Sequence, residues 1–180
     1  MPSQPYAEIG HHITRIDTAM MREGLAACYL LQGGDECAII ETGTHNTVPI
    51  ILALLAQRGI ERGQVKFVIP THVHLDHAGG VGGLMQALPE ATLLVHPRGA
   101  RHMIDPSKLK AGATAVYGEG EEAFAKVYGD IIPVDAQRVR EMHDGAHVMV
   151  GDRRLDFYDT PGHARHHFCV YDSLSAGIFT

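Results

Sequence analysis

The sequence lacks three features: paired cysteines, a long apolar run and a cluster of basic residues. Its three cysteines are Cys28, Cys37 and Cys169. None of them forms a Cys-x-x-Cys pair, so neither a thiolate zinc site nor a disulfide framework is indicated. No apolar run approaches the roughly 20 residues of a membrane span. The N-terminus has neither the basic nor the apolar segment of a secretory signal. We therefore expect a soluble, cytoplasmic protein that contacts no membrane.

Positive charge is also scarce. The formal net charge is -6, from 15 basic and 21 acidic residues. That balance disfavours a nucleic-acid surface and leaves a small molecule as the expected partner. A chain of 180 residues with 45% apolar residues is long enough for one domain with a substantial core. Histidine is the abundant residue, with 13 copies.

Four potential metal ligands lie close together in one short stretch. They are His72, His74, Asp76 and His77. They follow the apolar run 65–70, which is typical of a buried strand. Imidazole and carboxylate groups at this density suit zinc, iron or manganese. In a chain this rich in His and Asp, the pattern arises by chance on the order of once in a few hundred sequences. We therefore interpret the stretch as a metal site.

The rest of the chain alternates between strand and helix patterns, which predicts a layered sheet with helices on its outer face. Strands are expected at 13–17, 26–31, 36–40, 65–70, 92–96, 146–150, 154–158, 168–171 and 176–180. Helices are expected from about 48 to Gly59, with Asn46 or Thr47 as the N-cap, and at about 80–88, 98–104, 107–117 and 120–128. We interpret 97–135 as a helical insertion over the site.

Two motifs stand out: the stretch from Thr71 to Gly80 and the sequence Thr160-Pro161-Gly162-His163. Together they resemble the metallo-β-lactamase superfamily of hydrolases, and most nearly its glyoxalase II-like members. The resemblance extends from about residue 25 to the end of the chain. It implies an α+β protein with the αββα sandwich of that family. This chain would carry the N-terminal half and the first strands of the second sheet, as a single incomplete domain over 1–180.

The resemblance also implies the metal ligands. His72, His74 and His163 match the ligands of the first metal, a three-imidazole site with an open position for water. Asp76 and His77 match ligands of a second metal. Asp76 could also act as a general base on the bound water. The resemblance thus implies one or two zinc ions, with iron or manganese as alternatives.

Two further residues are expected beside the ligands. Glu41 stands where the family usually has the Asp of an Asp-x-Gly sequence, so a longer carboxylate would hydrogen-bond a ligand histidine. His167 stands where many relatives carry a second His after the Thr-Pro-Gly-His motif. It would support a ligand or contact substrate, although a residue at the start of a strand is the simpler interpretation. His166 is expected to be a loop residue in solvent, and His45 an ordinary polar residue of the Glu41 loop.

The family has a bridging Asp and a further His ligand that would lie beyond Thr180. We therefore expect an N-terminal portion of a longer protein, in which the second metal has only Asp76 and His77. An incomplete second sheet would leave an apolar sheet face open. We expect a second copy of the chain to cover that face in a homo-oligomer.

The resemblance implies a hydrolase that uses a metal-bound hydroxide on a small ester, thioester or lactone. Two alternatives remain open: an oxidoreductase like the mono-iron persulfide dioxygenases, and a metal-binding fragment without turnover. Metal content separates the three. Two zinc-like ions favour hydrolysis, one redox iron favours dioxygenation, and no metal favours the third.

Overall fold

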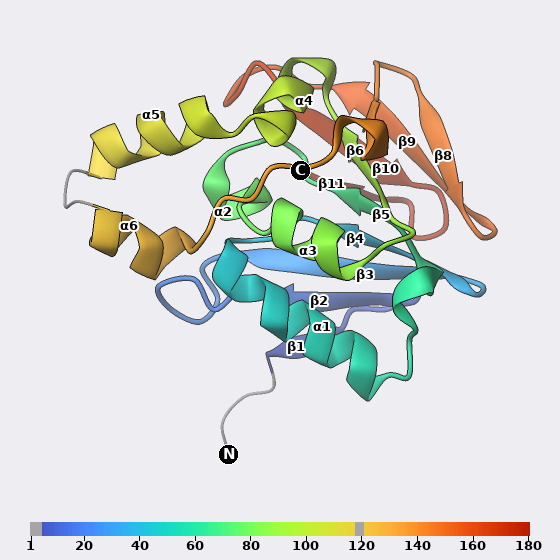
Figure 1. Ribbon diagram of the computed structural model, residues 1–180. Coiled ribbons are helices and arrows are strands. Elements are labelled where there is room, and N and C mark those ends of the chain that lie inside the picture. Colours follow the sequence, from blue (N-terminus) through green and yellow to red (C-terminus); the bar gives the residue numbers. More distant parts are fainter. Residues whose placement is uncertain (1–4, 118–120) are drawn as a thin grey trace.

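Two β-sheets form the centre of the computed structural model, which describes residues 5–117 and 121–180 (Figure 1). The first sheet has seven strands in the order β1-β2-β3-β4-β5-β6-β7. Its strands are β1 (Tyr6–Glu8), β2 (Ile13–Asp17), β3 (Ala27–Gly33), β4 (Glu36–Ile40), β5 (Val65–Ile69), β6 (Thr92–Val95) and β7 (Val139–Glu141). The second sheet has the order β11-β10-β9-β8. Its strands are β8 (His147–Val150), β9 (Arg153–Asp159), β10 (Phe168–Asp172) and β11 (Gly177–Phe179).

Helices α1 and α3 cover the face of the first sheet that points away from the second sheet (Figure 1). The α-helices are α1 (Val48–Gln57), α2 (Leu75–Ala78), α3 (Val81–Ala87), α4 (Pro97–Ile104), α5 (Ser107–Tyr117) and α6 (Glu121–Tyr128). Strands β4 to β7 run parallel, so α1 and α3 belong to the connections between them. The carboxyl ends of these strands therefore meet at one edge of the sheet, where ligands bind in such sheets.

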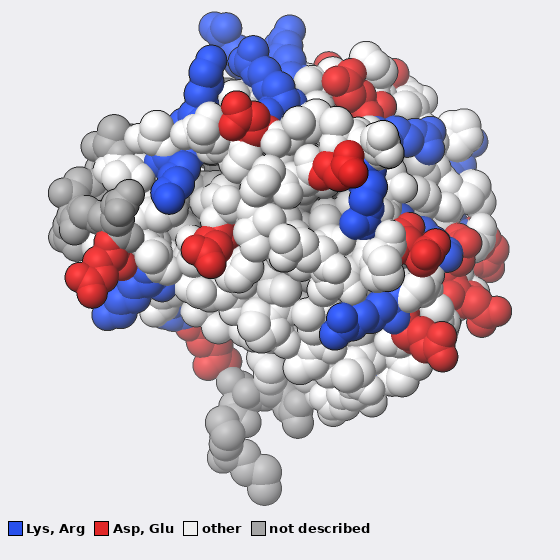
Figure 2. Space-filling view, in the orientation of Figure 1, with Lys and Arg blue, Asp and Glu red and all other residues white. Residues whose placement is uncertain are grey.

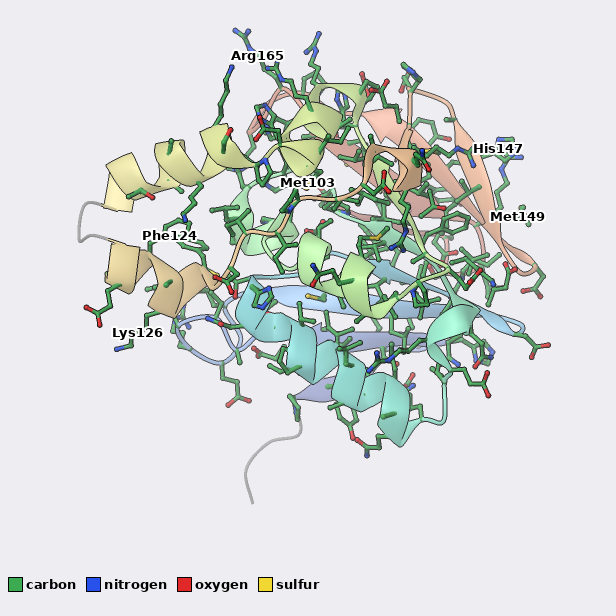
Figure 3. The ribbon with its side chains drawn as sticks, in the orientation of Figure 1. Met103, Phe124, Lys126, His147, Met149 and Arg165 are labelled. Atoms are coloured by element: carbon green, nitrogen blue, oxygen red, sulfur yellow. The ribbon has the colours of Figure 1, made fainter. Side chains whose placement is uncertain are left out.

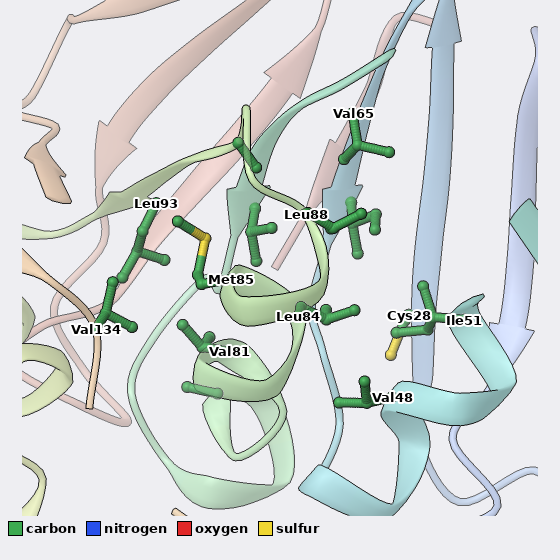
Figure 4. Close-up of a cluster of buried hydrophobic side chains, with 14 of the residues drawn as sticks. Cys28, Val48, Ile51, Val65, Val81, Leu84, Met85, Leu88, Leu93 and Val134 are labelled. Carbon is green, nitrogen blue, oxygen red and sulfur yellow. The ribbon is translucent and has the colours of Figure 1, made fainter. Parts of the chain in front are cut away.

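Each face of the first sheet buries its own apolar core. Along β3, Cys28 and Leu30 point to the helices. The next residue, Leu31, points to the opposite face, toward the second sheet. The helix side contains Val48 of α1 and Leu84 of α3 (Figure 4). The core between the two sheets sets how far the second sheet stands from the first.

The two sheets also touch backbone to backbone at the edge opposite the strand ends. A Cβ atom placed on Gly33 would lie 1.9 Å from the carbonyl oxygen of Val150, and one placed on Gly151 would lie 2.0 Å from the carbonyl oxygen of Gly33. The backbone N–H of Gly151 donates to Glu36 over 2.9 Å. Only glycine allows this approach of the β3–β4 turn to the β8–β9 turn.

Most predicted elements agree with the structure, and two strands match residue for residue: 13–17 and 36–40. The N-cap of α1 is Thr47. The sequence analysis missed three short elements, β1, β7 and α2. The predicted helix start at 120 lies outside the described residues. The 97–135 segment connects β6 to β7, and it contains α4, α5 and α6.

The expected open face of the first sheet needs a correction. Its apolar side chains, among them Ile13, Leu31 and Ile40, are buried against the second sheet, because four strands suffice to cover them. The outer face of the second sheet carries exposed side chains instead, including His147 and Met149 (Figure 3). Covering by a second copy stays a prediction.

Candidate metal centre

The His stretch lies at the carboxyl end of β5, beside the end of β4. Glu41 follows β4 directly and has a φ of 61°, a left-handed conformation that is uncommon for a residue other than glycine. That conformation turns its buried side chain toward the neighbouring loop, where its Oε1 accepts the backbone N–H of Thr71 over 2.7 Å. The two strand ends are thereby joined through a side chain.

Three histidines come together in the way that a metal requires. One ring nitrogen from each of His72, His74 and His163 lies within 4.8 Å of the others. Nδ1 of His74 and Nε2 of His163 are 3.0 Å apart. Nδ1 of His72 hydrogen-bonds with Oγ1 of Thr71 over 3.1 Å. Its Nε2 is buried and has no hydrogen-bond partner among the described residues.

The protonation of His72 suits a metal ligand. Burial, and then the neighbouring imidazoles led by His77, lower the pKa of His72 from 6.5 to about 3. The ring is therefore neutral at pH 7 and keeps a lone pair. An orphaned buried nitrogen among two other imidazoles fits a divalent cation, because three neutral histidines with one open position form a common catalytic zinc set.

A second group of donors adjoins this cluster. His77 donates through Nδ1 to Oε2 of Glu41 over 2.7 Å, and its Nε2 lies 3.3 Å from Oδ2 of Asp76. The rings of His77 and His72 have centroids 4.1 Å apart. Glu41 therefore orients His77 in the way that a carboxylate orients a metal-bound histidine. A cation bound by Asp76 and Nε2 of His77 would replace the proton that lies between these two groups in the metal-free chain.

The charges of this second group are strongly coupled. Burial opposes a charge on His77, but its hydrogen bonds to Asp76 and Glu41 raise its pKa from 6.5 to about 10. The hydrogen bond from His77 lowers the pKa of Asp76 from 3.8 to about 2. In this arrangement His77 is an imidazolium held between two carboxylates.

The third imidazole comes from the loop between β9 and β10. His163 is exposed there. His167 is buried at the end of the same loop, where its Nδ1 hydrogen-bonds with Oγ1 of Thr160 over 2.8 Å. Its ring centroid lies 5.2 Å from that of His72. The backbone N–H of Phe168 donates to the carbonyl of Thr71 over 3.1 Å, which joins this loop to the His stretch.

The sequence analysis missed the position of His166. Its Nδ1 accepts the backbone N–H of Val73 over 3.3 Å, and its ring centroid lies 5.5 Å from that of His74. The side chain is half-buried beside the cluster, whereas a solvent position was expected. Burial, and then the nearby imidazoles of His74 and His102, lower the pKa of His166 to about 4. The only sequence signal was its place three residues after His163. His45 packs against Gly83 of α3, outside the cluster.

These observations agree with the comparisons to known proteins. A sequence model of the metallo-β-lactamase superfamily matches residues 21–180. The chain therefore belongs to the metallo-β-lactamase superfamily. Members of this superfamily are typically metal-dependent hydrolases, and their fold implies binding of a divalent metal.

Individual relatives are distant. The chain is 26% identical over 154 residues to the metallo-β-lactamase fold-containing protein ST1585 of Sulfurisphaera tokodaii, a match that covers 81% of this chain and 52% of that protein. It is 24% identical over 152 residues to the β-lactamase-like protein 2 homolog of Caenorhabditis elegans, with 84% and 42% covered. The chain thus spans about half the length of these relatives or less.

The fold is also that of solved structures. A metallo-β-lactamase from Cronobacter sakazakii with a HARLDQ motif superposes with a TM-score of 0.71 at 21% identity, over 97% of this chain and 63% of that one. The predicted superfamily and the α+β metallo-β-lactamase fold are confirmed. The glyoxalase II-like subtype stays a prediction, as do the roles of the individual site residues. Among the described helices, none is long and apolar enough to cross a membrane.

Proposed function

We propose that this chain binds zinc at its histidine cluster and hydrolyses a small ester, thioester or lactone. The observation that carries the proposal is the convergence of His72, His74 and His163, with ligand atoms within 4.8 Å of one another and an orphaned nitrogen on His72. The family membership supports the reaction class, because hydrolysis with a divalent metal is typical of the superfamily.

Each residue has a proposed part. His72, His74 and His163 would hold the first cation, and Asp76 and His77 would hold a second one. Glu41 fixes the orientation of His77, and His167 supports the cluster from the β10 side. A bound divalent cation lowers the pKa of water to about 7 and polarises a carbonyl group. The carboxylate of Asp76, ionised at neutral pH, accepts the proton of the attacking water.

Metal analysis combined with an ester, thioester and lactone panel tests the proposal. We expect zinc to be retained and at least one substrate class to be hydrolysed. The variant His72→Ala should lose both metal and hydrolysis, whereas His147→Ala, an exposed histidine on the outer face of the second sheet, should change neither.

Other outcomes would replace the proposal. One redox-active iron per chain together with oxygen consumption on a persulfide would favour the dioxygenase alternative. Zinc binding without turnover on any class would favour a metal-binding fragment. Hydrolysis that survives His72→Ala would contradict the assignment of the site.

A further inference from the structure

Two cavities meet at His74, one on each side of the histidine cluster. The larger has a volume of about 990 Å³ and lies between α4 and the β9–β10 loop. The smaller has a volume of about 480 Å³ and lies among α2, α5 and α6. Both volumes are in the range of small-molecule sites. A ligand bound across His74 would therefore have one part in each cavity.

The larger cavity is basic. Its charged lining comes from Arg98 and Arg101 of α4 and from Arg165 of the β9–β10 loop, and none of its lining residues is acidic among the residues that the structure describes. Lys and Arg side chains gather over α4 and the start of α5, at the top of the molecule (Figure 2). The side chain of Arg165 reaches up from this region (Figure 3). The cavity is thus locally basic in a chain with a net charge of -6, which favours an anionic ligand there.

The donors of this cavity are only partly used within the protein. One N–H of Arg98 donates to the carbonyl of Arg165 over 3.3 Å, and Nε of Arg101 donates to Nε2 of His102 over 3.3 Å. Each guanidinium has five N–H groups, so several remain for a ligand. Nδ1 of His166 accepts a backbone N–H, which places the proton of the neutral ring on Nε2 as a further donor.

Two carboxylates on the adjoining elements already have partners. Asp105 at the end of α4 accepts the backbone N–H of Ser107 over 3.1 Å. Asp159 at the end of β9 lies 3.2 Å from Nε2 of His96. Neither lines the cavity, so neither neutralises its arginines there.

The smaller cavity has a different character. Among the described residues, its apolar lining comes from Leu75, Leu109, Ala113 and Tyr128, and its charged lining from Lys108 and Asp76, of which Asp76 lies beside the histidines. Leu75 and Tyr128 belong to a buried cluster that α6 shares with α2. This lining suits an aliphatic group, because burying each methylene favours binding by about 0.8 kcal/mol.

We propose that the natural substrate is bipartite, with an aliphatic acyl group in the α5–α6 cavity and an anionic group in the arginine cavity. The bond between the two parts would lie at the histidine cluster. This inference rests on the proposed function for its reaction. In that reaction an oxygen of water bonds to the acyl carbon, the C–S or C–O bond breaks, and the thiol or alcohol leaves with a proton. The substrate class is thus an acyl thioester or ester of an anionic thiol or alcohol.

Binding of unreactive thioethers to the metal-free chain tests the cavities without any turnover. The probes are 3-(hexylthio)propanesulfonate, the matching neutral alcohol and the methyl analogue of the sulfonate, measured by calorimetry. We expect the sulfonate to bind about tenfold more tightly than the alcohol. The double variant Arg101→Ala/Arg165→Ala should remove that preference, whereas Arg140→Ala, an exposed arginine of β7, should keep it. Replacing hexyl by methyl should weaken binding at least about tenfold.

Several results would overturn the inference. They are equal binding of sulfonate and alcohol, a sulfonate preference that survives the double variant, and no effect of the hexyl group. Displacement of the sulfonate by a lower concentration of single-stranded oligonucleotide would assign the arginines to an extended polyanion. If the sulfonate binds as expected but no thioester, ester or lactone is hydrolysed, the proposed function fails and the assignment of the cavities stands.

Discussion

The two sheets contribute to the site in different ways. The first sheet supplies buried, mutually bonded groups: His72 is 3% exposed and Glu41 4%. The second sheet supplies His163 from an exposed loop, where its ring nitrogen contacts only His74 among the hydrogen bonds of the described residues. The part of the site that the first sheet supplies is therefore held in place by the fold itself. A cation bound at the cluster would add to the order of the loop that carries His163, because metal binding contributes free energy to the segments that it joins.

The largest expected effect is on metal affinity and on stability, and the stability change should distinguish the ligand of the first sheet from that of the second. His72→Ala and His163→Ala should each reduce zinc affinity by at least about 100-fold, since each removes one of three ligands. In chelator, His72→Ala should also destabilise the chain by about 1–3 kcal/mol because the side chain is buried, whereas His163→Ala should change stability by less than about 0.5 kcal/mol. Zinc titration and urea unfolding measure both. Equal destabilisation by the two variants would contradict the comparison.

A smaller effect should follow from Glu41, which joins the two strand ends of the first sheet. Glu41→Gln keeps an oxygen for the N–H of Thr71 but loses the charge that faces His77. We expect affinity for a second metal to fall about 10–100-fold, with the first site much less affected. Stepwise metal titration by calorimetry distinguishes the two sites. The exposed Glu141→Gln is the matched control, and an equal loss at both sites would refute the division of ligands.

A further effect is the pH dependence of the metal-free chain. The raised pKa of His77 means that its proton stabilises the folded state. This contribution is complete below 6.5 and is lost as pH rises through about 10. The lowered pKa of Asp76 acts in the opposite direction, and its contribution is lost as pH falls from 3.8 through about 2.

Urea midpoints in chelator, measured between about pH 6 and pH 10, should therefore fall with pH in the wild type. The variant His77→Asn should flatten this slope, while His163→Ala should leave it unchanged because the second sheet supplies that histidine. A slope that persists in His77→Asn would show that other groups control it.

The sequence predicts the parts of the site whose residues are contiguous, and it misses those that only folding brings together. The His stretch and the strands around it were predictable because their ligands and apolar runs are contiguous, so local pattern and final position coincide. Three-residue strands such as β1 and β7 have too few residues for a periodic pattern, and they exist only through pairing with β2 and β6. Glu41 could be placed near a ligand from its position after β4, but the partner His77 was visible only in the structure.

The cavities could not be predicted at all. Arg101 and Arg165 are 64 residues apart in the sequence and meet because α4 and the β9–β10 loop pack over the same strand ends. Neither arginine has a local pattern that distinguishes it from other surface residues. The position of His166 likewise depends on the backbone of Val73, which only folding brings near it.

The contact of Gly33 with Gly151 has a consequence for how such a domain can change in evolution. Both turns are already at the closest approach that a backbone allows, so an inserted residue or a side chain there would force the sheets apart. The opposite edge is occupied by the long α4–α6 segment, which connects β6 to β7 and adds no strand to either sheet. Insertions and deletions should therefore accumulate in the α4–α6 segment, beside the histidine cluster, so that the surroundings of the cluster can change while the distance between the sheets is kept.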